Sequence, residues 1–441
     1  MTSLTVPPAP QPLRGRLRLP GDKSLSHRTA LLAALAQGES RLDNYLVAGV
    51  TQPLLQALQA LGVPWRLRGT TLTVQGVGLT GLRPPQAPLH CGHSATTLRF
   101  LAGLLAAAGL PAVLDGSPGL RRRPMRRITE PLQRMGAPIR DTQGHAPLFL
   151  APRPPHAPLQ AAVHRLPVAS AQVKTALLLA ALAARGTTEI HEPGPSRDHS
   201  ERLLQAMGAP LRRPAPHTVT LQGPLERPLQ PLRLTLPGDI SSAAFLIAAA
   251  LLVPRSEVHL VGVLLNPTRT GFLEALQRMG ASLQVTPRGE TYGEPVGDLT
   301  VRYTPRLRGI SVAGDLVVRM IDEFPAFAVV AAAAQGVTEV RNAGELRHKE
   351  SDRIAALVAQ LRRLGVEAAE RPDGFVIRGG RRWHGGTVEA HGDHRLAMSL
   401  AVAGLAAQTP VTVQGAEVIR ESFPTFERAL EQLGAPWSAD L

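Results

Sequence analysis

The sequence predicts a mixed α/β (α+β) protein made of two similar halves, each built from three repeated units. First, the pattern Leu-x-x-(Leu/Met)-Gly-(Ala/Val) occurs six times, at successive intervals of 74, 72, 72, 85 and 69 residues. Second, Leu19-Pro20-Gly21-Asp22 recurs 217 residues later as Leu236-Pro237-Gly238-Asp239. Three copies of the pattern lie between these two segments, and three follow the second one. Repeats of this length are whole supersecondary units, so the chain should contain six of them.

Each repeat is predicted to contain two helices. The glycine of each pattern should end an amphipathic helix, because glycine readily adopts the left-handed conformation that follows a last turn. These glycines are Gly62, Gly136, Gly208, Gly280, Gly365 and Gly434. A helix rich in Ala and Leu precedes each one and, being apolar on nearly all sides, belongs in a core. The predicted core helices are Thr29–Ala36, Thr97–Ala108, Val173–Ala184, Ala243–Leu252, Ala326–Ala334 and Leu396–Ala407. Short β-prone runs complete a strand–helix–strand–helix–strand unit.

The repeated Leu-Pro-Gly-Asp segments also predict where the chain passes between two domains. Residues 22–237 should form one domain, and residues 1–21 together with 238–441 the other. Pro-Gly pairs suit chain crossings that act as hinges, which places hinges near residues 20–22 and 237–239. A length of 441 residues fits two domains better than one core.

Composition favours a cytoplasmic protein. A lone cysteine, Cys91, excludes an internal disulfide and any multi-cysteine metal site, which suits a reducing compartment. We expect Cys91 to be a packed small residue. The segment Met1–Pro20 lacks the apolar region of a signal peptide. The longest apolar runs, such as Ala243–Val253, fall short of the ~18 residues that a membrane span needs.

The net charge of +14 is compatible with nucleic-acid binding, but other features favour small polyanionic substrates. Long Lys/Arg runs are missing from the sequence, and aromatic residues that could stack on bases make up only 3% of it. The densest basic stretch, Arg121–Arg127, is too short for a nucleic-acid-binding tail.

The lysines are unusual because the other 45 of the 48 basic residues are arginines. Lys23, Lys174 and Lys349 all lie in segments dense in polar groups. Lysine is a compact point charge that can shift its pKa and transfer a proton, which arginine cannot. Chance retention is the alternative for each lysine alone, but three out of three in polar clusters favours a functional role.

Polar residues gather at the start of each Ala/Leu-rich helix. Ser, Thr and Asp are common helix N-caps, so for any one helix capping alone could explain them. Helix N-termini also present free N–H groups and bind anions. Cations are unfavourable there unless an anion is present. The cations at these helix starts are Lys23, Arg28, Arg99 and Arg395. This pattern predicts phosphate or carboxylate ligands.

Eight segments, in order, resemble those of the 5-enolpyruvylshikimate-3-phosphate synthase family, over essentially the whole chain. They are Gly21–Arg28, Ser94–Arg99, Leu120–Met125, Ala169–Lys174, Ser196–His199, Ile321–Pro325, Lys349–Arg353 and Gly392–Arg395. The resemblance implies two domains of three βαβαββ-type units each, an inside-out α/β barrel arrangement, with the active site in the interdomain cleft. It also implies transfer of the enolpyruvyl group of phosphoenolpyruvate to shikimate 3-phosphate, with release of phosphate.

The resemblance assigns substrate contacts residue by residue. For shikimate 3-phosphate it implies Lys23, Ser24, Arg28, Ser170, Gln172, Ser196, Arg197, Asp322 and Lys349. For phosphoenolpyruvate it implies Lys23, Ala95, Arg123, Gln172, Arg353 and Arg395. No metal or organic cofactor, nucleic acid or membrane is expected, and we expect a monomer. Two polyanionic substrates brought together require many cations.

The chemistry needs a base for the attacking hydroxyl and an acid for the enol methylene. We expect Asp322 to serve as the base and Glu350 to transfer the methyl protons. Lys349 should stabilise phosphate or relay a proton, and Lys23 should lie between the two substrates. The adjacent Lys349 and Glu350 should perturb each other's pKa values. For Lys349–Arg353 alone, a solvated helix start is the alternative.

Some positions depart from the family pattern. Ala171 replaces a serine of some relatives, and Glu421 replaces a lysine that contacts phosphoenolpyruvate. Ala95 stands where many relatives have glycine, beside the site of the inhibitor glyphosate, so we expect comparative insensitivity to glyphosate. His391–His394 could mimic a metal site but lacks further ligands.

The sequence is also compatible with two alternative functions. The UDP-N-acetylglucosamine enolpyruvyl transferases share the fold, but usually carry a reactive cysteine in the loop corresponding to Asp115–Met125, which has none here. A basic nucleic-acid-binding repeat protein of related fold is the other alternative. The combination of Asp322 with Lys349 and Glu350 favours catalysis over it.

Overall fold

The computed structural model describes residues 3–436 and 438–440. The predicted domains also include residues 1, 2, 437 and 441, which lie outside the described residues. The chain divides into two compact units. Unit 1 comprises Met1–Pro20, Pro237–Glu290 and Pro295–Leu441, and unit 2 comprises Gly21–Leu236 and Thr291–Glu294. The short segment Thr291–Glu294 belongs with unit 2, although it lies within residues 238–441, which the repeated Leu-Pro-Gly-Asp segments assign to the other domain.

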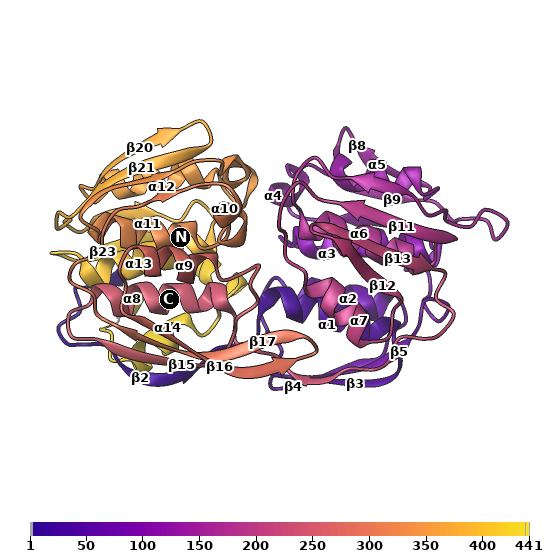
Figure 1. Cartoon of the computed structure of the whole chain (residues 1–441), viewed down its shortest axis with the longest axis horizontal. Helices are drawn as coiled ribbons and strands as arrows, with labels where there is room; N and C mark the ends of the chain where they lie inside the picture. The colour runs from indigo at the N-terminus through magenta and orange to yellow at the C-terminus, as the bar shows by residue number, and fades with distance from the viewer. Residues whose placement is uncertain (1–2, 437, 441) are drawn as a thin grey trace. The chain divides into compact units, whose positions relative to one another are not determined.

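Three buried helices form the centre of unit 2 (Figure 1): α1 (Lys23–Leu35), α3 (Ala95–Ala108) and α6 (Ala171–Ala181). Each packs on a four-stranded sheet of its own repeat, α1 on β5, α3 on β9 and α6 on β13. The sheets, in strand order, are β14 (Arg233–Thr235), β3 (Gln37–Asp43), β5 (Thr71–Val77), β4 (Trp65–Arg68); β6 (Leu89–His90), β7 (Ala112–Asp115), β9 (His145–Leu150), β8 (Ile139–Thr142); and β10 (Val163–Arg165), β11 (Gly186–His191), β13 (Thr218–Gly223), β12 (Leu211–Ala215).

Unit 1 repeats this plan around α8 (Ile240–Leu252), α11 (Phe324–Ala333) and α13 (His394–Ala406), which pack on β15, β21 and β23. Its sheets, in strand order, are β16 (Leu283–Thr291), β17 (Glu294–Arg302), β15 (Glu257–Leu264), β2 (Arg14–Arg18); β18 (Ser311–Val312), β19 (Gly336–Val340), β21 (Gly374–Gly379), β20 (Glu367–Arg371); and β22 (Gly386–Glu389), β23 (Val411–Gln414), β1 (Ser3–Val6), β24 (Ser438–Asp440). Each of the six sheets contains one parallel strand pair.

The predicted second helix of each repeat is also present. In unit 2 these are α2 (Gln52–Ala60), α5 (Arg126–Arg134) and α7 (His199–Ala206), and in unit 1 they are α9 (Gly271–Arg278), α12 (Arg353–Arg363) and α14 (Phe426–Gln432). The six pattern glycines follow them with φ between +83° and +91°. That left-handed conformation is easy for glycine, which confirms the predicted helix ends. Shorter elements are α4 (Pro118–Arg121), α10 (Asp315–Arg319), η1 (Gly344–His348) and η2 (Ala416–Glu421).

The core helices begin earlier than the sequence predicted. α1, for example, begins at Lys23 rather than Thr29, and α6 at Ala171 rather than Val173. In these two helices the added residues are mostly polar, and apolar periodicity does not mark a polar first turn as helix. Cys91 is 1% exposed, and burial raises the pKa of its thiol, as expected of a packed residue. Within the described residues, no helix has the length and apolar character needed to cross a bilayer.

Candidate functional site

In unit 2, the three core helices begin with side-chain caps. Asp22 Oδ1 accepts from the Leu25 N–H at 2.8 Å, Ser94 Oγ from the Thr97 N–H at 3.1 Å, and Ser170 Oγ from the Val173 N–H at 3.5 Å. The alternative interpretation of these residues as N-caps is therefore correct for all three helices. Capping does not exclude ligand binding, because a hydroxyl that accepts from the backbone can still donate to an anion.

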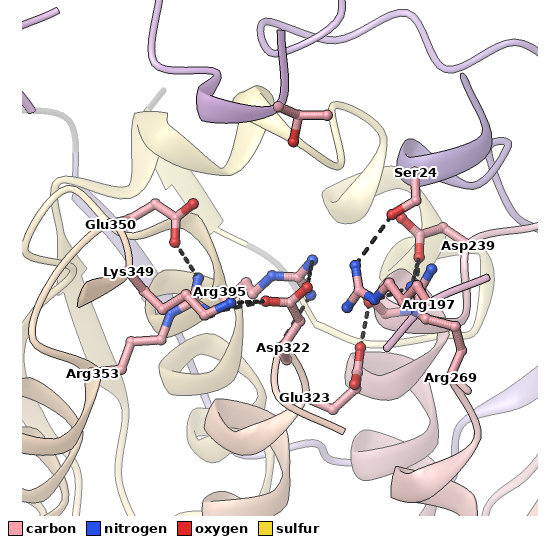
Figure 2. Close-up of polar contacts among 12 residues, drawn as sticks. Ser24, Arg197, Asp239, Arg269, Asp322, Glu323, Lys349, Glu350, Arg353 and Arg395 are labelled. Carbon is pink, nitrogen blue, oxygen red and sulfur yellow. Dashed lines mark hydrogen bonds and ion pairs between the residues drawn. The ribbon is translucent and has the colours of Figure 1, made fainter. Parts of the chain in front are cut away.

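A hydroxyl- and cation-bearing surface surrounds the start of α1. Lys23 is the first residue of the helix and is half-buried, and Ser24 is buried. Arg197 Nη1 donates to Ser24 Oγ at 3.2 Å (Figure 2). Ser196 Oγ is buried and has no hydrogen-bond partner within the described residues. A buried hydroxyl without a partner is costly, so Ser196 is well suited to receive a polar ligand.

Arg28 lies deeper than the sequence implied. It is 3% exposed, and its guanidinium lies 4.8 Å from the centre of the Phe100 ring. Nε donates to Ser200 Oγ at 2.8 Å, and Nη2 donates to Thr175 Oγ1 at 3.2 Å. Arg28 thus joins α1 to α6 and α7, and its role as a substrate ligand stays a prediction.

Gln172, in the first turn of α6, is held by two residues of α3. Its Nε2 donates to Thr96 Oγ1 at 2.8 Å, and its Oε1 accepts from Arg99. Arg99 also donates to the Pro124 carbonyl at 3.0 Å, beside the predicted ligand Arg123. The structure therefore connects the segments containing Ser94–Arg99, Arg123 and Gln172, all within unit 2. Sequence reasoning singled out Arg99 as a cation but did not recognise this connecting role.

The start of α3 places Ala95 in a confined position. Ala95 is the first helical residue after the Ser94 cap and is 2% exposed. Its methyl group therefore has almost no contact with solvent. Arg123 follows the short helix α4 and is half-buried, and its carbonyl oxygen lies 3.1 Å from Nδ1 of His145.

In unit 1, Asp322 lies among three cations (Figure 2). Its Oδ1 accepts from Lys349 Nζ at 3.2 Å and from Arg353 Nη1 at 3.4 Å, and its Oδ2 lies 3.9 Å from Arg395 Nη2. Asp322 directly precedes the N-cap of α11, whereas Lys349 follows η1. These three cations surround the Asp322 carboxylate, which therefore lies in a strongly positive environment.

Glu350 and Arg353 form the second part of this arrangement. Arg353 Nη2 donates to Glu350 Oε2 at 2.7 Å, and Arg353 Nε donates to Asp393 Oδ2 at 2.7 Å. Burial acts to lower the pKa of Arg353, but Asp393 and Glu350 outweigh it and raise the pKa overall. Burial acts to raise the pKa of Asp393, but Arg353 holds it below the ordinary value. Arg353 and Asp393 are therefore charged near neutral pH. Lys349 is paired with Asp322, and Glu350 is paired with Arg353.

Two further buried polar clusters were not predicted. In unit 1, Arg269 Nη2 donates to Ser241 Oγ at 2.9 Å and lies 3.4 Å from Asp239 Oδ1, and Ser241 also donates to Glu323. In unit 2, Lys174 pairs with two buried glutamates, described below. The signal for Lys174 was its rarity as a lysine, whereas nothing in the sequence marked its partners.

The segment His391–His394 contains the N-cap of α13. Within the described residues, no group of three or more His, Cys, Asp or Glu side chains is arranged to hold a metal ion. Asp393 instead caps α13, accepting from the Arg395 N–H at 2.9 Å. His391 Nε2 lies 2.9 Å from Gln360 Nε2.

Comparison with known proteins assigns this arrangement to a family. The family model for EPSP synthase (3-phosphoshikimate 1-carboxyvinyltransferase) matches residues 7–430. The chain belongs to the EPSP synthase family. The 3-phosphoshikimate 1-carboxyvinyltransferase of Geobacter sulfurreducens is 48% identical over 435 residues, covering 98% of this chain and 99% of that protein. That of Coxiella burnetii is 45% identical, covering 96% of this chain and 95% of the relative.

Solved structures agree with the family assignment. EPSP synthase from Acinetobacter baumannii superposes with a TM-score of 0.89 at 37% identity, covering all of both chains. The enolpyruvyl transferase NikO from Streptomyces tendae has a TM-score of 0.78 at 21% identity over 99% of both chains, and shows the fold alone. The mixed α/β fold predicted from the repeats is confirmed, and the chain is an enolpyruvyl transferase of the shikimate pathway.

Proposed function

We propose that this chain transfers the enolpyruvyl group of phosphoenolpyruvate to the 5-hydroxyl of shikimate 3-phosphate, using both sets of residues described above. The observation that carries the proposal is Asp322, a carboxylate in contact with Lys349 and Arg353 and adjacent to Arg395. A base surrounded by cations suits a reaction in which a hydroxyl loses its proton while an anionic substrate is bound.

The unit 2 set is suited to shikimate 3-phosphate. Ser24, Ser170 and Ser196 supply hydroxyl groups, and Lys23 and Arg197 supply positive charge. The open hydroxyl of Ser196 and the free N–H groups at helix starts match a phosphate, which accepts several hydrogen bonds at once. Arg28, Gln172, Asp322 and Lys349 complete the set of residues predicted for this substrate.

Phosphoenolpyruvate would be held by arginines, with Lys23, Ala95 and Gln172 beside it. Arg353 is paired with Glu350 at 2.7 Å. A substrate carboxylate at this guanidinium would therefore compete with Glu350. When the substrate carboxylate replaces Glu350 at Arg353, the Glu350 side chain would become available for proton transfer. Arg123 and Arg395 complete the predicted clamp.

The proposed proton transfers balance over the reaction. Glu350 takes up a proton once the substrate carboxylate has replaced it at Arg353. Asp322 then accepts the proton of the 5-hydroxyl as the hydroxyl oxygen bonds to C2 of the enol, and Glu350 gives its proton to the methylene carbon. In the second step the C2–O bond to phosphate breaks, Glu350 takes a proton back from the methyl group, and Asp322 passes the hydroxyl proton to the departing phosphate. Lys349 and Lys23 stabilise the negative charge that develops on phosphate.

The proposed setting is the cytoplasm, with the protein acting as a monomer on small molecules and without a metal or organic cofactor, a nucleic acid or a membrane. The absence of a cysteine from Asp115–Met125 disfavours the UDP-N-acetylglucosamine reaction.

The test is phosphate release by the purified protein mixed with phosphoenolpyruvate and one acceptor. Rapid release with shikimate 3-phosphate, and none with UDP-N-acetylglucosamine or RNA, is expected. Addition of a chelator should leave the rate unchanged. Release only with the nucleotide sugar, or with neither acceptor, would overturn the assignment.

A further inference from the structure

Lys174 is a buried lysine that the proposed chemistry does not use. It lies on α6, and its side chain is only 5% exposed. Its Nζ is 2.5 Å from Glu192 Oε2 and 2.7 Å from Glu201 Oε1, and those two side chains are 3% and 4% exposed. Glu192 directly follows β11, and Glu201 lies in the first turn of α7. One ammonium group therefore joins three elements of unit 2.

Glu192 connects this cluster to a predicted substrate ligand. Its other oxygen, Oε1, accepts from the backbone N–H of Ser170 at 3.1 Å. Ser170 is the N-cap of α6, and its hydroxyl is assigned to shikimate 3-phosphate. The carboxylate that holds the lysine thus also fixes the backbone from which this hydroxyl projects.

A second link runs alongside the first. Thr175, next to Lys174, shares a hydrogen bond of 2.6 Å with Ser200, next to Glu201. Ser200 Oγ accepts from Arg28 Nε at 2.8 Å. The helices α6 and α7 are therefore joined by two adjacent polar contacts, and the second of them continues to α1.

Burial of the charged groups of Lys174, Glu192 and Glu201 carries a large desolvation cost. Burial alone lowers the pKa of Lys174, but Glu201 and Glu192 outweigh it and the pKa lies above the ordinary lysine value, so the group is charged. Two carboxylates share one ammonium, and Glu201 Oε2 has no partner within the described residues. Apolar residues of similar size often serve stability equally well. A fixed geometry for Ser170 is a benefit that apolar residues could not supply.

We propose that Lys174, Glu192 and Glu201 form a positioning network for the shikimate 3-phosphate site. Lys174 anchors Glu192, Glu192 orients Ser170, and Glu201 ties the anchor to α7. The three residues act on substrate affinity through Ser170 and do not contact the substrate. The inference rests on the proposed function, because it takes Ser170 as a ligand of shikimate 3-phosphate.

Glu192→Gln tests the network. An amide has one accepting oxygen and one donating NH₂ group, whereas Lys174 Nζ and the Ser170 N–H both donate. Either orientation of the amide therefore sets a donor against a donor. The matched control is Glu189→Gln, three residues earlier and within β11, where the carboxylate contacts the partly exposed His191 at 2.5 Å.

The readouts are the dissociation constant of shikimate 3-phosphate alone, by calorimetry, and the KM of each substrate. Glu192→Gln should weaken shikimate 3-phosphate binding about tenfold or more, with the KM of phosphoenolpyruvate changed less than about twofold, by analogy with other residues that orient ligands indirectly. Glu189→Gln should match the parent protein. Unchanged affinity, or equal changes for both substrates, would show that the cluster has no positioning role.

A double-mutant cycle with Ser170→Ala separates positioning from general packing. If Glu192 acts through the Ser170 hydroxyl, its substitution should have little further effect once that hydroxyl is gone. Additive effects would overturn the proposal. Phosphate release by the parent protein tests the proposed function separately, so a failure of the network would leave that assignment intact.

A second variant guards against loss of folding. Lys174→Met combined with Glu201→Gln removes the anchor while keeping the net charge of the cluster. It should weaken shikimate 3-phosphate binding in the same way as Glu192→Gln. If both variants fail to fold, the cluster serves stability and the proposal is wrong.

Discussion

Units 1 and 2 repeat one scaffold but carry different chemistry at the starts of their core helices. In unit 2, two of the three caps are hydroxyls, Ser94 and Ser170. In unit 1, the caps Asp239 and Asp393 are carboxylates that also contact buried arginines, Arg269 and Arg353. A hydroxyl cap leaves a donor for a ligand, whereas a carboxylate cap can hold a cation in place. We therefore expect unit 2 to contribute mainly to anion binding and unit 1 mainly to proton transfer.

The charges of the two predicted sets agree with this division. The unit 2 set contains four cations, Lys23, Arg28, Arg123 and Arg197, and no carboxylate. The unit 1 set contains three cations together with two carboxylates, Asp322 and Glu350, each of which is bonded to one of these cations. Substitutions in unit 2 should therefore act mainly on substrate affinity, and substitutions of the unit 1 carboxylates mainly on the rate of chemistry.

The largest expected effect follows from replacing the proton-transfer carboxylate. Glu350→Gln keeps the shape and can still accept from Arg353, but it cannot exchange a proton. We expect kcat to fall about 10²- to 10⁴-fold, with the dissociation constant of shikimate 3-phosphate nearly unchanged. Steady-state phosphate release and calorimetry measure the two. Glu367→Gln, in an exposed pair with Arg378 in the same unit, is the control. A change in affinity alone would erase the proposed division between the units.

The two lysines of unit 2 provide the next comparison. Lys23→Arg keeps the charge but replaces a compact ammonium with a planar group beside the substrates, and activity should fall on the order of a hundredfold, with stability retained. Lys174→Arg should affect activity less, but overpacking the buried cluster should reduce the free energy of unfolding by about 1–3 kcal/mol. Activity assays and urea unfolding measure the pair. Equal activity losses, with folding intact, would show that the ranking is wrong.

The repeated helices could be predicted because short, local sequence patterns mark their positions and ends. The six pattern glycines predicted helix ends, because the left-handed position that follows a helix is most often occupied by glycine. The apolar core helices were predicted for a similar reason. Their polar first turns were missed as helix, because periodicity cannot distinguish a functional first turn from a loop.

The pairing of buried charges was not predictable in this way. Lys174 was identified as unusual, yet its partners Glu192 and Glu201 lie 18 and 27 residues further along the chain with no pattern to mark them. The inward position of Arg28 also depends on Ser200, which only the packing of α7 brings near. Partners of this kind are fixed by tertiary structure and carry no periodic signal.

Acid sensitivity should reveal another property of unit 2. Burial lowers the pKa of His27 and of His164 to about 4, from 6.5. Both are neutral when folded, so the unfolded chain binds more protons below pH 6.5. The free energy of unfolding is therefore at its full value above pH 6.5 and decreases as the pH falls toward 4. At pH 5 each histidine lowers it by about 2 kcal/mol.

His164→Leu isolates one of these contributions. Both ring nitrogens of His164 are buried and have no partner within the described residues, so leucine leaves no polar group unsatisfied. The variant should lose about 2 kcal/mol less than the parent between pH 7 and pH 5, measured by urea unfolding at each pH. The exposed His156→Leu is the control. An unchanged pH dependence would contradict the lowered pKa of His164.

The smallest expected effect concerns Ala95, where unit 2 departs from many relatives. Ala95 is 2% exposed at the first position of α3, where the resemblance places glycine in many relatives, next to the phosphoenolpyruvate site. Glyphosate is longer than phosphoenolpyruvate, so the extra methyl group should press on its far end. Overpacking costs about 1–3 kcal/mol, which is roughly ten- to a hundredfold in affinity.

Ala95→Gly should therefore restore glyphosate sensitivity while changing the KM of phosphoenolpyruvate much less. Inhibition curves for both forms, with phosphoenolpyruvate as the competing substrate, measure the difference. Ala171→Gly, at the first position of α6, is the matched control, because it makes the same substitution at the start of another core helix of unit 2. Strong inhibition of the parent protein would falsify the assignment of specificity to this methyl group. If Ala95→Gly and Ala171→Gly increased glyphosate sensitivity equally, the cause would be greater flexibility at the helix N-termini. Only the Ala95 methyl group should reduce the space available to the inhibitor.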